Sequence, residues 1–316
     1  MSDIGIVVVT HNSEAHIGPC LDAILPTGAE IVVVDNQSAD RTIAEAARRG
    51  VRLVGNPDNR GFAAAVNQGF AVLNSAYVLM LNPDAILLGG LEALHEACCL
   101  PGAAGAGGCL LDGQGRPQIG FMVRQLPTAA TLVLEVLLLN KIWPSNPVNR
   151  RYRGLGMDYS ARFQVEQPAG AFLMVPKAVW LELGGFDEGF SPLWFEDVDF
   201  CRRAADRGRR FYYVPQAVAI HTGGHAIQKL TVEKRRVYWY GSLLRYSAKH
   251  FRPLAFRVVC LAVVAGSLLR GLGESILHRS VQPLAAYAKV VRHASRCFLF
   301  GWGDGPLLSG SKRSRV

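Results

Sequence analysis

The sequence predicts an α/β fold built on a mostly parallel sheet that helices flank. Short apolar runs rich in β-branched residues occur at residues 4–9, 31–34 and 77–81, and such runs are typical of strands buried on both faces. Segments with helical spacing of apolar residues separate them, as at Ile17 and Leu21. Repeated alternation of strand and helix within about 85 residues is typical of a doubly wound parallel sheet.

The remaining elements follow from the same signals. A helix that ends at Arg49 and a helix over residues 62–73 enclose a third short strand at 51–54. Further along the chain, residues 198–205 have helical periodicity, and the apolar run 214–220 predicts another strand.

The charge of the chain is unevenly distributed. Residues 1–200 contain 13 Lys and Arg against 21 Asp and Glu, a balance of −8, whereas residues 201–316 contain 21 against 4, a balance of +17. A basic C-terminal part predicts an anionic partner, either nucleic acid or a lipid surface. The sequence has no helix-turn-helix, zinc or RNA-binding signature, so we expect an anionic membrane surface and no nucleic acid.

Two apolar stretches, Thr131–Trp143 and Val258–Leu269, bear on the same question. The second has 12 apolar or small residues between Arg257 and Arg270, whereas a membrane-spanning helix needs about 20. We therefore expect a basic, apolar helix that lies in a membrane interface, with packing in a protein core as the alternative for both stretches.

Cysteine usage indicates the compartment. The seven cysteines form no CxxC pair, and a strand-like run follows Met1 almost at once. The odd count and the lack of a signal peptide predict a reducing cytoplasm, and metal binding through cysteine is not expected.

Polar side chains gather where the predicted strands end. In an open α/β sheet, ligands bind at the carboxyl ends of the strands. No GxGxxG or P-loop sequence follows any strand, so the pattern favours a nucleotide held through its base, its ribose and a bridging cation. The residues at the strand ends are Thr10 and Asn12, Asp35 and Asn36, Asn59 and Arg60, and Asp84.

Three carboxylates, Glu196, Asp197 and Asp199, lie within four residues of one another beside Trp194 and Phe195. Carboxylates rarely have apolar neighbours unless something pairs with them or uses them, and a half-buried carboxylate has the proton affinity that a general base needs. The alternative is structural, because acidic residues in the first turn of a helix also stabilise the helix dipole.

Several short motifs extend the argument over roughly residues 4–250. They are Val7-Val-Val-Thr-His-Asn-Ser13, Val33-Val-Asp-Asn-Gln-Ser38, Asn59-Arg-Gly-Phe62 with Asn67, Leu81-Asn-Pro-Asp84, Gly170-Ala-Phe-Leu173, Gly184-Gly-Phe-Asp-Glu188, Phe195-Glu-Asp-Val-Asp199 and His221. Each motif alone is weak, since Asn-Pro-Asp is usually only a turn. Together and in this order they resemble the family 2 glycosyltransferases of the GT-A fold, in the rhamnosyltransferase-like branch.

The resemblance implies a nucleoside-diphosphate sugar as donor, with Mg²⁺ or Mn²⁺ held by Asp84 and His221. The metal motif of the family is often Asp-x-Asp, and its first position here is Asn82, which predicts weaker metal binding. A solvent-facing or core-satisfied His221 is the alternative. The implied nucleotide-sugar residues are Thr10, Asn12, Asp35, Asn36, Asn59, Arg60, Gly61, Asn67, Asn82 and Asp84.

The resemblance also gives the acidic stretch a role. Asp197 would accept the proton of an acceptor hydroxyl as that oxygen attacks the anomeric carbon, so that a single displacement inverts the anomeric configuration. Trp194, Glu196 and Gly170 would bind the acceptor, and Asp199 would be structural. The processive members of the family carry a QxxRW sequence that is absent here, so we expect transfer of one or a few sugars to a glycan or polyprenyl-linked acceptor.

We thus expect an inverting, metal-dependent glycosyltransferase that moves a rhamnose-like sugar in cell-surface polysaccharide assembly, on the inner face of the plasma membrane. A non-catalytic nucleotide-sugar-binding relative or scaffold is the alternative. A nucleotidyltransferase is disfavoured because the first strand is not followed by a glycine-rich triphosphate loop.

The expected domains follow the same division. The GT-A domain would span residues 1–250, with a nucleotide-binding half at 1–100 and an acceptor-binding half at 101–250. A basic C-terminal region with amphipathic or apolar helices and a disordered tail would follow at 251–316.

Overall fold

A computed structural model of the chain describes residues 3–223 and 230–303. The chain divides into two compact units, of which the first comprises residues 1–126 and 147–229 and the second residues 127–146 and 230–316. The second unit therefore begins before the expected boundary at residue 250. The reason is that helix α11 (Val232–His250) packs against helices α12 (Pro253–His278) and α13 (Gln282–Phe300).

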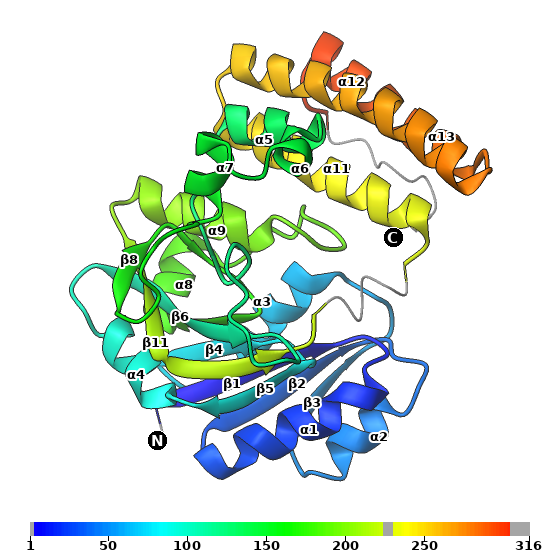
Figure 1. Ribbon diagram of the computed structural model, residues 1–316. Helices are drawn as coiled ribbons and strands as arrows, with labels where there is room; N and C mark the ends of the chain where they lie inside the picture. Colours follow the sequence, from blue (N-terminus) through cyan, green and yellow to red (C-terminus); the bar gives the residue numbers. More distant parts are fainter. Residues whose placement is uncertain (1–2, 224–229, 304–316) are drawn as a thin grey trace. The chain divides into compact units, whose positions relative to one another are not determined.

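The first unit is built on one large sheet (Figure 1). Its strands lie in the order β3-β2-β1-β4-β10-β6-β11-β5, and β8 pairs with β11. In that order they are β3 (Arg52–Asn56), β2 (Glu30–Asn36), β1 (Ile4–Thr10), β4 (Tyr77–Leu81), β10 (Phe172–Pro176), β6 (Ala103–Leu111), β11 (Arg210–His221), β5 (Ala85–Gly89) and β8 (Phe163–Val165). Outside this sheet, β7 (Val123–Arg124) pairs with β9 (Gln167–Pro168).

The sheet is parallel where the sequence predicted parallel strands, over β3, β2, β1 and β4. Beyond β4 it is mixed, because β10 is antiparallel to both of its neighbours and β5 is antiparallel to β11. Only Asn82, Pro83 and Asp84 separate β4 from β5, and the chain reverses there, so that β5 pairs with β11 and not with β4. Because β6 and β11 are again parallel to each other, the expectation of a mostly parallel sheet is confirmed, with β10, β5 and β8 as its antiparallel strands.

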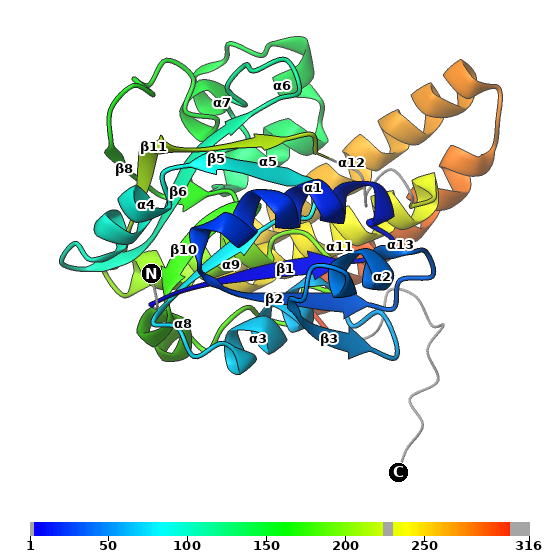
Figure 2. The ribbon, with the colours of Figure 1, turned by 90° about the horizontal axis from the view of Figure 1, so that it is seen from below.

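Helices cover both faces of this sheet. Figures 1 and 2 show α1 and α2 on one face and α3, α8 and α9 on the other. On the second face α3 lies directly on β1, since a Cβ atom at Gly69 would stand 2.5 Å from Cγ1 of Val7. The helices are α1 (Glu14–Ile24), α2 (Thr42–Ala47), α3 (Phe62–Val72), α4 (Leu91–Cys98), α7 (Pro147–Tyr152), α8 (Lys177–Leu183) and α9 (Glu196–Asp206), with a short 3₁₀ helix at Leu25–Thr27.

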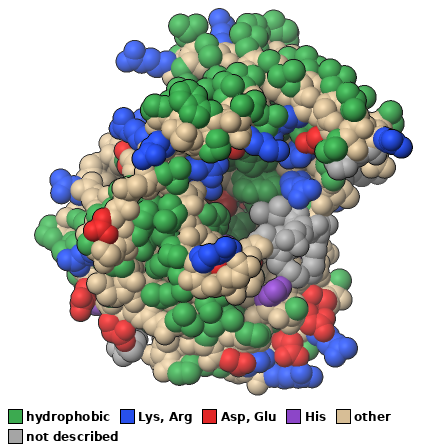
Figure 3. Space-filling model, in the orientation of Figure 1, with side chains coloured by type: hydrophobic (Ala, Val, Ile, Leu, Met, Phe, Trp, Pro, Cys, Tyr) green, Lys and Arg blue, Asp and Glu red, His purple; other side chains and the backbone are tan. Residues whose placement is uncertain are grey.

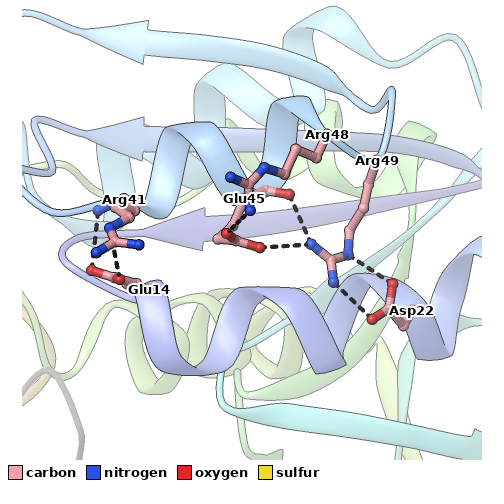
Figure 4. A network of polar contacts seen from close by, with 6 residues as sticks. All are labelled: Glu14, Asp22, Arg41, Glu45, Arg48 and Arg49. Carbon is pink, nitrogen blue, oxygen red and sulfur yellow. Dashed lines mark hydrogen bonds and ion pairs between the residues drawn. The ribbon is translucent and has the colours of Figure 1, made fainter.

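A network of charged side chains fastens α1 to α2 (Figure 4). The guanidinium of Arg49 donates to both carboxylate oxygens of Asp22, at 2.7 and 2.8 Å, and to Glu45 at 3.1 Å, while Arg41 pairs with Glu14 at 3.5 Å. The hydrogen bonds from Arg49 lower the pKa of Asp22. Solvent screens such exposed pairs, so the network orients the two helices more than it stabilises the fold.

The second unit consists of helices. The stretch Thr131–Trp143 forms α5 (Ala129–Val136) and α6 (Leu139–Ile142), which Leu138 separates with a φ of 65°. The run Val258–Leu269 lies inside α12, which has 26 residues. By length and composition, the segment Pro253–Leu277 could cross a membrane, since an 18-residue window of it has a mean hydropathy of 1.8, whereas the 12-residue run alone is too short. The expected disordered tail lies outside the described residues.

A buried ion pair fixes α9 against the end of α8. Nε of Arg203 donates to Asp199 at 2.8 Å, and the guanidinium also donates to the carbonyl oxygens of Leu183 and Gly185. The side chain of Asp199 is fully buried. This geometry supports the structural role expected for Asp199.

Removing Asp199 should therefore destabilise the protein. We expect Asp199→Ala to lower the free energy of unfolding by about 3–5 kcal/mol, because the charge of Arg203 is left without its buried partner. Denaturant unfolding measures the loss. The matched control is Asp206→Ala, which breaks the more exposed pair of Arg202 and Asp206 at the same spacing on the same helix, and it should cost less than about 1 kcal/mol. Similar losses in both variants would refute the assignment.

Candidate active site

The first three strands end in register at one edge of the sheet. Thr10 lies opposite Asp35, and Asp35 lies opposite Gly55. The buried carboxylate of Asp35 accepts hydrogen bonds from the hydroxyls of Thr10, at 2.7 Å, and Ser38, at 2.5 Å, and from the amide of Ser38. Asp35 therefore holds the loop after β2 against the end of β1, and its contact with a nucleotide base stays a prediction.

The asparagines at this edge join its loops. Asn12, with a φ of 54°, accepts from the amide of Ala39 through its side chain at 2.7 Å. Asn36 donates to the carbonyl oxygen of Gly61 at 3.0 Å. Asn59 closes its own turn by accepting from the amide of Gly61 at 3.0 Å. These contacts give the strand-end edge a defined shape.

Two further residues of the predicted nucleotide-sugar set are Arg60, between Asn59 and Gly61, and Asn67 on α3. Arg60 is exposed on the loop after β3. The amide of Asn67 exchanges two hydrogen bonds of 3.0 Å with the backbone of Phe186 and donates to Glu188 at 3.0 Å. The side chain of Asn67 thus positions the loop that precedes the acidic helix α9.

Strand β11 places His221 beside Asp84. Nε2 of the buried histidine lies 3.6 Å from Oδ1 of Asp84 and 3.4 Å from the amide nitrogen of Asn82. The other ring nitrogen, Nδ1, lies 3.3 Å from Oε1 of Gln118, a contact that assigns the proton to Nδ1 and leaves the Nε2 lone pair toward Asp84. Burial lowers the pKa of His221 and the charge of Asp84 partly offsets this, so the neutral, ligand-competent ring is favoured.

This pair fits a divalent cation that a phosphate also binds. A carboxylate oxygen and an imidazole nitrogen 3.6 Å apart can contact one ion, and the chemistry of the pair suits Mn²⁺ or Mg²⁺. Within residues 3–223 and 230–303, no group of three or more His, Cys, Asp and Glu side chains could hold a metal. Among the described residues, Asn82 is the neighbouring side chain that could add a ligand, and water or substrate could add others.

Asp197 lies in the first turn of α9, partly buried. One carboxylate oxygen accepts from the backbone amide of Gly170 at 3.0 Å and the side-chain amide of Gln167 at 3.4 Å, and the other accepts from the amide of Val198 at 2.8 Å. Burial raises the pKa of Asp197, while the backbone amides and the charge of Arg124 favour its ionised form. The result is a carboxylate with increased proton affinity that still has donors to stabilise its charge.

Gly170 supports this carboxylate. A Cβ atom at Gly170 would lie 3.1 Å from Cβ and 3.3 Å from Oδ2 of Asp197, closer than almost all such contacts in proteins. Only glycine therefore leaves Asp197 this close to the backbone amide without a shift. We expected Gly170 to admit the acceptor sugar; the contact that the structure shows is with the catalytic candidate.

Glu196 differs from its neighbour in its hydrogen bonds. Its side chain is buried, and Oε2 has no hydrogen-bond partner among the described residues. Burial, and after it the charge of Asp197, raises the pKa of Glu196 well above its usual range. Since Asp197 has the donors that stabilise a charge, Asp197 is the better base and Glu196 the better neutral hydrogen-bonding group.

A tight turn presents both acids. Trp194 and Phe195 have φ values of 78° and 70°, a left-handed conformation that side-chain-bearing residues rarely adopt. Such conformations cluster at functional sites, where the surrounding structure holds them. Just before the turn, the carbonyl oxygen of Pro192 accepts from the amide of Phe62 at 2.8 Å, which ties this loop to the loop after β3.

Sequence reasoning missed the segment that connects the two candidate groups. Phe121 stacks on His221 with ring centroids 5.3 Å apart, and Arg124 lies over Phe121 at 5.9 Å. Arg124 pairs with Gln167 between β7 and β9, and Gln167 contacts Asp197. A continuous series of contacts thus joins the Asp84–His221 pair to Asp197, with a guanidinium between them.

The buried acid pair predicts a pH-dependent stability. A raised carboxyl pKa in the folded state means that the stability associated with neutral Glu196 is lost as the pH rises from about 4.3, the unfolded value, through the folded pKa. Glu196→Gln, which cannot ionise, should therefore have a higher Tm than the parent at pH 8, by about 2–4 °C per kcal/mol. The difference should shrink toward pH 4. A difference independent of pH in thermal unfolding would exclude a neutral Glu196.

Comparison with known proteins agrees with this geometry. Residues 5–130 match the model of the family described as Glycosyl transferase family 2. The chain is 24% identical over 239 residues to rhamnosyltransferase WbbL of Escherichia coli, covering 70% of this chain and 83% of that protein. It is 24% identical over 287 residues to the pre-mycofactocin glycosyltransferase of Mycobacterium tuberculosis, covering 87% of this chain but only 54% of that protein.

Solved structures show the same fold. GalNAc-T7 in complex with UDP, GalNAc and Mn²⁺ aligns with a TM-score of 0.52 at 14% identity, over 70% of this chain and 44% of that chain. The mannosyltransferase PcManGT from Pyrobaculum calidifontis, in complex with GDP-Man and Mn²⁺, aligns with a TM-score of 0.51 at 16% identity, over 94% and 87%. The resemblance seen in the sequence is thus confirmed: residues 5–130 match the family 2 glycosyltransferase model, the fold is that of GT-A glycosyltransferases, and the chain is an enzyme of the transferase class.

Proposed function

We propose that this enzyme is an inverting, metal-dependent glycosyltransferase that moves a sugar from a nucleoside diphosphate to an acceptor hydroxyl. The observation that carries the proposal is the series of contacts from the Asp84–His221 pair through Phe121 and Arg124 to Asp197. These contacts link a candidate phosphate-binding pair to a candidate base, which supports the proposal. Inversion by single displacement needs one base and no covalent enzyme intermediate.

We assign proton transfer, cation binding and acceptor binding to different residues. Asp197 takes the proton of the acceptor hydroxyl, and the amides of Gly170 and Val198 hold the carboxylate in the ionised form that this step requires. Asp84 and His221 would hold the cation, which when bound offsets negative charge on the leaving diphosphate. Glu196, neutral and buried, supplies a hydrogen bond to an acceptor hydroxyl, and Trp194 supplies an apolar surface for the sugar ring.

The substrate class rests on the relatives. One is named a rhamnosyltransferase, which favours a rhamnose-like donor sugar. The glycan or polyprenyl-linked acceptor in cell-surface polysaccharide assembly is proposed from the sequence motifs alone. Two structural neighbours form complexes with Mn²⁺ and with UDP or GDP-Man, which supports a nucleotide-sugar donor and a divalent cation, Mg²⁺ or Mn²⁺, for this chain.

Asn82 favours one other reading, a nucleotide-sugar-binding protein without activity. It stands where a second carboxylate would strengthen the metal site. Hydrolysis of dTDP-, UDP- and GDP-sugars, measured with and without Mn²⁺, separates the two readings. The enzyme should release nucleoside diphosphate from one donor class only with the cation present, whereas the alternative predicts donor binding without release from any donor.

Replacing the candidate base should remove transfer but leave donor binding intact. We expect Asp197→Asn to lower kcat/KM by roughly 10²–10⁴-fold, the usual contribution of a general base. Because the pKa of Asp197 is raised, the parent rate should fall as the pH drops through that value, and the variant should lose this acid limb. Asp206→Asn, on an exposed part of the same helix, is the control. Transfer within tenfold of the parent would show that Asp197 is not the base.

Replacing the candidate metal ligands should weaken the binding of the cation. Asp84→Ala and His221→Ala should each raise the Mn²⁺ concentration needed for half-maximal activity by more than tenfold, and Gln118→Ala, which frees the histidine ring, by about 10–100-fold. Calorimetric titration of Mn²⁺ in the presence of donor gives a readout independent of turnover. His95→Ala, a histidine on α4, serves as control. Unchanged activity in excess EDTA would eliminate the metal site.

A further inference from the structure

Helix α12 presents a continuous apolar stripe to solvent. At 100° per residue, the stripe residues fall within a sector of about 100° around the helix. Leu254 at one end is 77% exposed and Ile276 at the other is 78% exposed. Figure 3 shows hydrophobic side chains gathered over the helices of this unit. The stripe consists of Leu254, Val258, Leu261, Ala265, Leu268, Leu269, Leu272 and Ile276.

The opposite face of α12 is already occupied. Val259, Cys260 and Val263 are fully buried, and the helix packs against α13, α5 and α11. The stripe therefore is a second apolar face, which the folding of this unit leaves uncovered. From Leu254 to Ile276 it runs about 33 Å at 1.5 Å per residue. Contiguous apolar surface of this extent marks a contact with a protein or a membrane.

Charge identifies the kind of partner. Residues 230–303 contain 12 Lys and Arg against two acidic residues. Those two, Glu233 and Glu274, are paired within the unit with Lys289 and Arg236. The remaining excess of positive charge would oppose docking onto a second copy of the same basic surface, whereas it attracts an anionic lipid surface.

Basic residues stand at both ends of the stripe. Arg252 and Arg257 precede and flank its beginning, and Arg279 follows its end, all three exposed. Arg270, which follows the apolar run Val258–Leu269 in the sequence, points the other way. It lies about 150° around the helix from the centre of the stripe and donates to the carbonyl oxygen of Glu135 at 2.8 Å. The lipid-facing cluster thus consists of the residues at the helix ends.

We propose that α12 lies in the plane of an anionic membrane surface, with its stripe among the acyl chains and its terminal arginines at the head groups. A spanning orientation is disfavoured, because α11 and α13 pack along α12 and would bring Arg245, Lys289 and Arg292 into hydrocarbon. The cytoplasmic leaflet of a plasma membrane has the required charge. Where the proposed function holds, this surface gives access to a polyprenyl-linked acceptor, the one part of the inference that rests on that function.

Vesicle co-sedimentation of the full chain tests the proposal. The parent should sediment with vesicles of phosphatidylcholine and phosphatidylglycerol, much less with phosphatidylcholine alone, and less as NaCl rises from about 0.1 to about 1 M, where the screening length falls to about 3 Å. A triple variant, Leu261→Glu, Leu268→Glu and Leu272→Glu, should bind at least tenfold more weakly. These side chains are more than half exposed, so the fold should persist, as circular dichroism can verify.

The matched control is Leu181→Glu, the same substitution at a leucine of α8 that is 68% exposed, and it should bind like the parent. Equal sedimentation of the triple variant would overturn the proposal. So would a dimer, detected by light scattering, that only the triple variant loses, because a second copy would then cover the stripe. Hydrolysis of a soluble donor should be the same in all variants, so failure of the membrane surface and failure of the proposed function give different results.

Discussion

The first unit depends on keeping a carboxylate ionised where water is partly excluded. Burial alone would protonate Asp197, so the fold has to supply hydrogen-bond donors at the right places. Gly170 gives an amide that only a glycine can bring so close, Gln167 extends a side chain from β9, and Val198 offers the free amide of a helix first turn. The left-handed turn at Trp194 and Phe195 then aims the helix terminus toward these donors.

The two acidic residues beside this turn, Glu196 and Asp197, differ in proton affinity because their surroundings differ. Glu196 is buried, and one of its oxygens has no hydrogen-bond partner among the described residues, which favours its neutral form. A neutral Glu196 would make the ionised state of Asp197 less costly than two adjacent charges. The proposed roles of the two residues, Asp197 as base and Glu196 as a hydrogen-bonding group, thus rest on their unequal hydrogen bonding rather than on their sequence positions. The acidic stretch alone could not distinguish this from an ordinary acidic helix start.

The parts of the structure that could be predicted from the sequence are those with a clear hydrophobic pattern or an abrupt polar end. The buried strands β1, β2 and β4 and the polar residues at their ends were predictable, because continuous β-branched runs and abrupt polar stops leave few alternatives. The segment with Gln118, Phe121 and Arg124 was not, since its place depends on the pairing of two-residue strands far apart in the chain. Helix α12 was underestimated because Arg270 seemed to end an apolar run, whereas on a helix it only changes face.

The candidate metal site has two protein ligands, Asp84 and His221, and lacks a second carboxylate. Asn82 stands where a carboxylate would strengthen metal binding by the protein alone. The described residues supply no third His, Cys, Asp or Glu. Small divalent cations at phosphate sites are commonly held by one or two protein ligands, with substrate oxygens and water completing the shell. A site built from Asp84 and His221 would therefore bind its cation tightly only together with a diphosphate. If the proposed site holds a cation, the free protein should bind it weakly, and cation binding should be coupled to the presence of the donor.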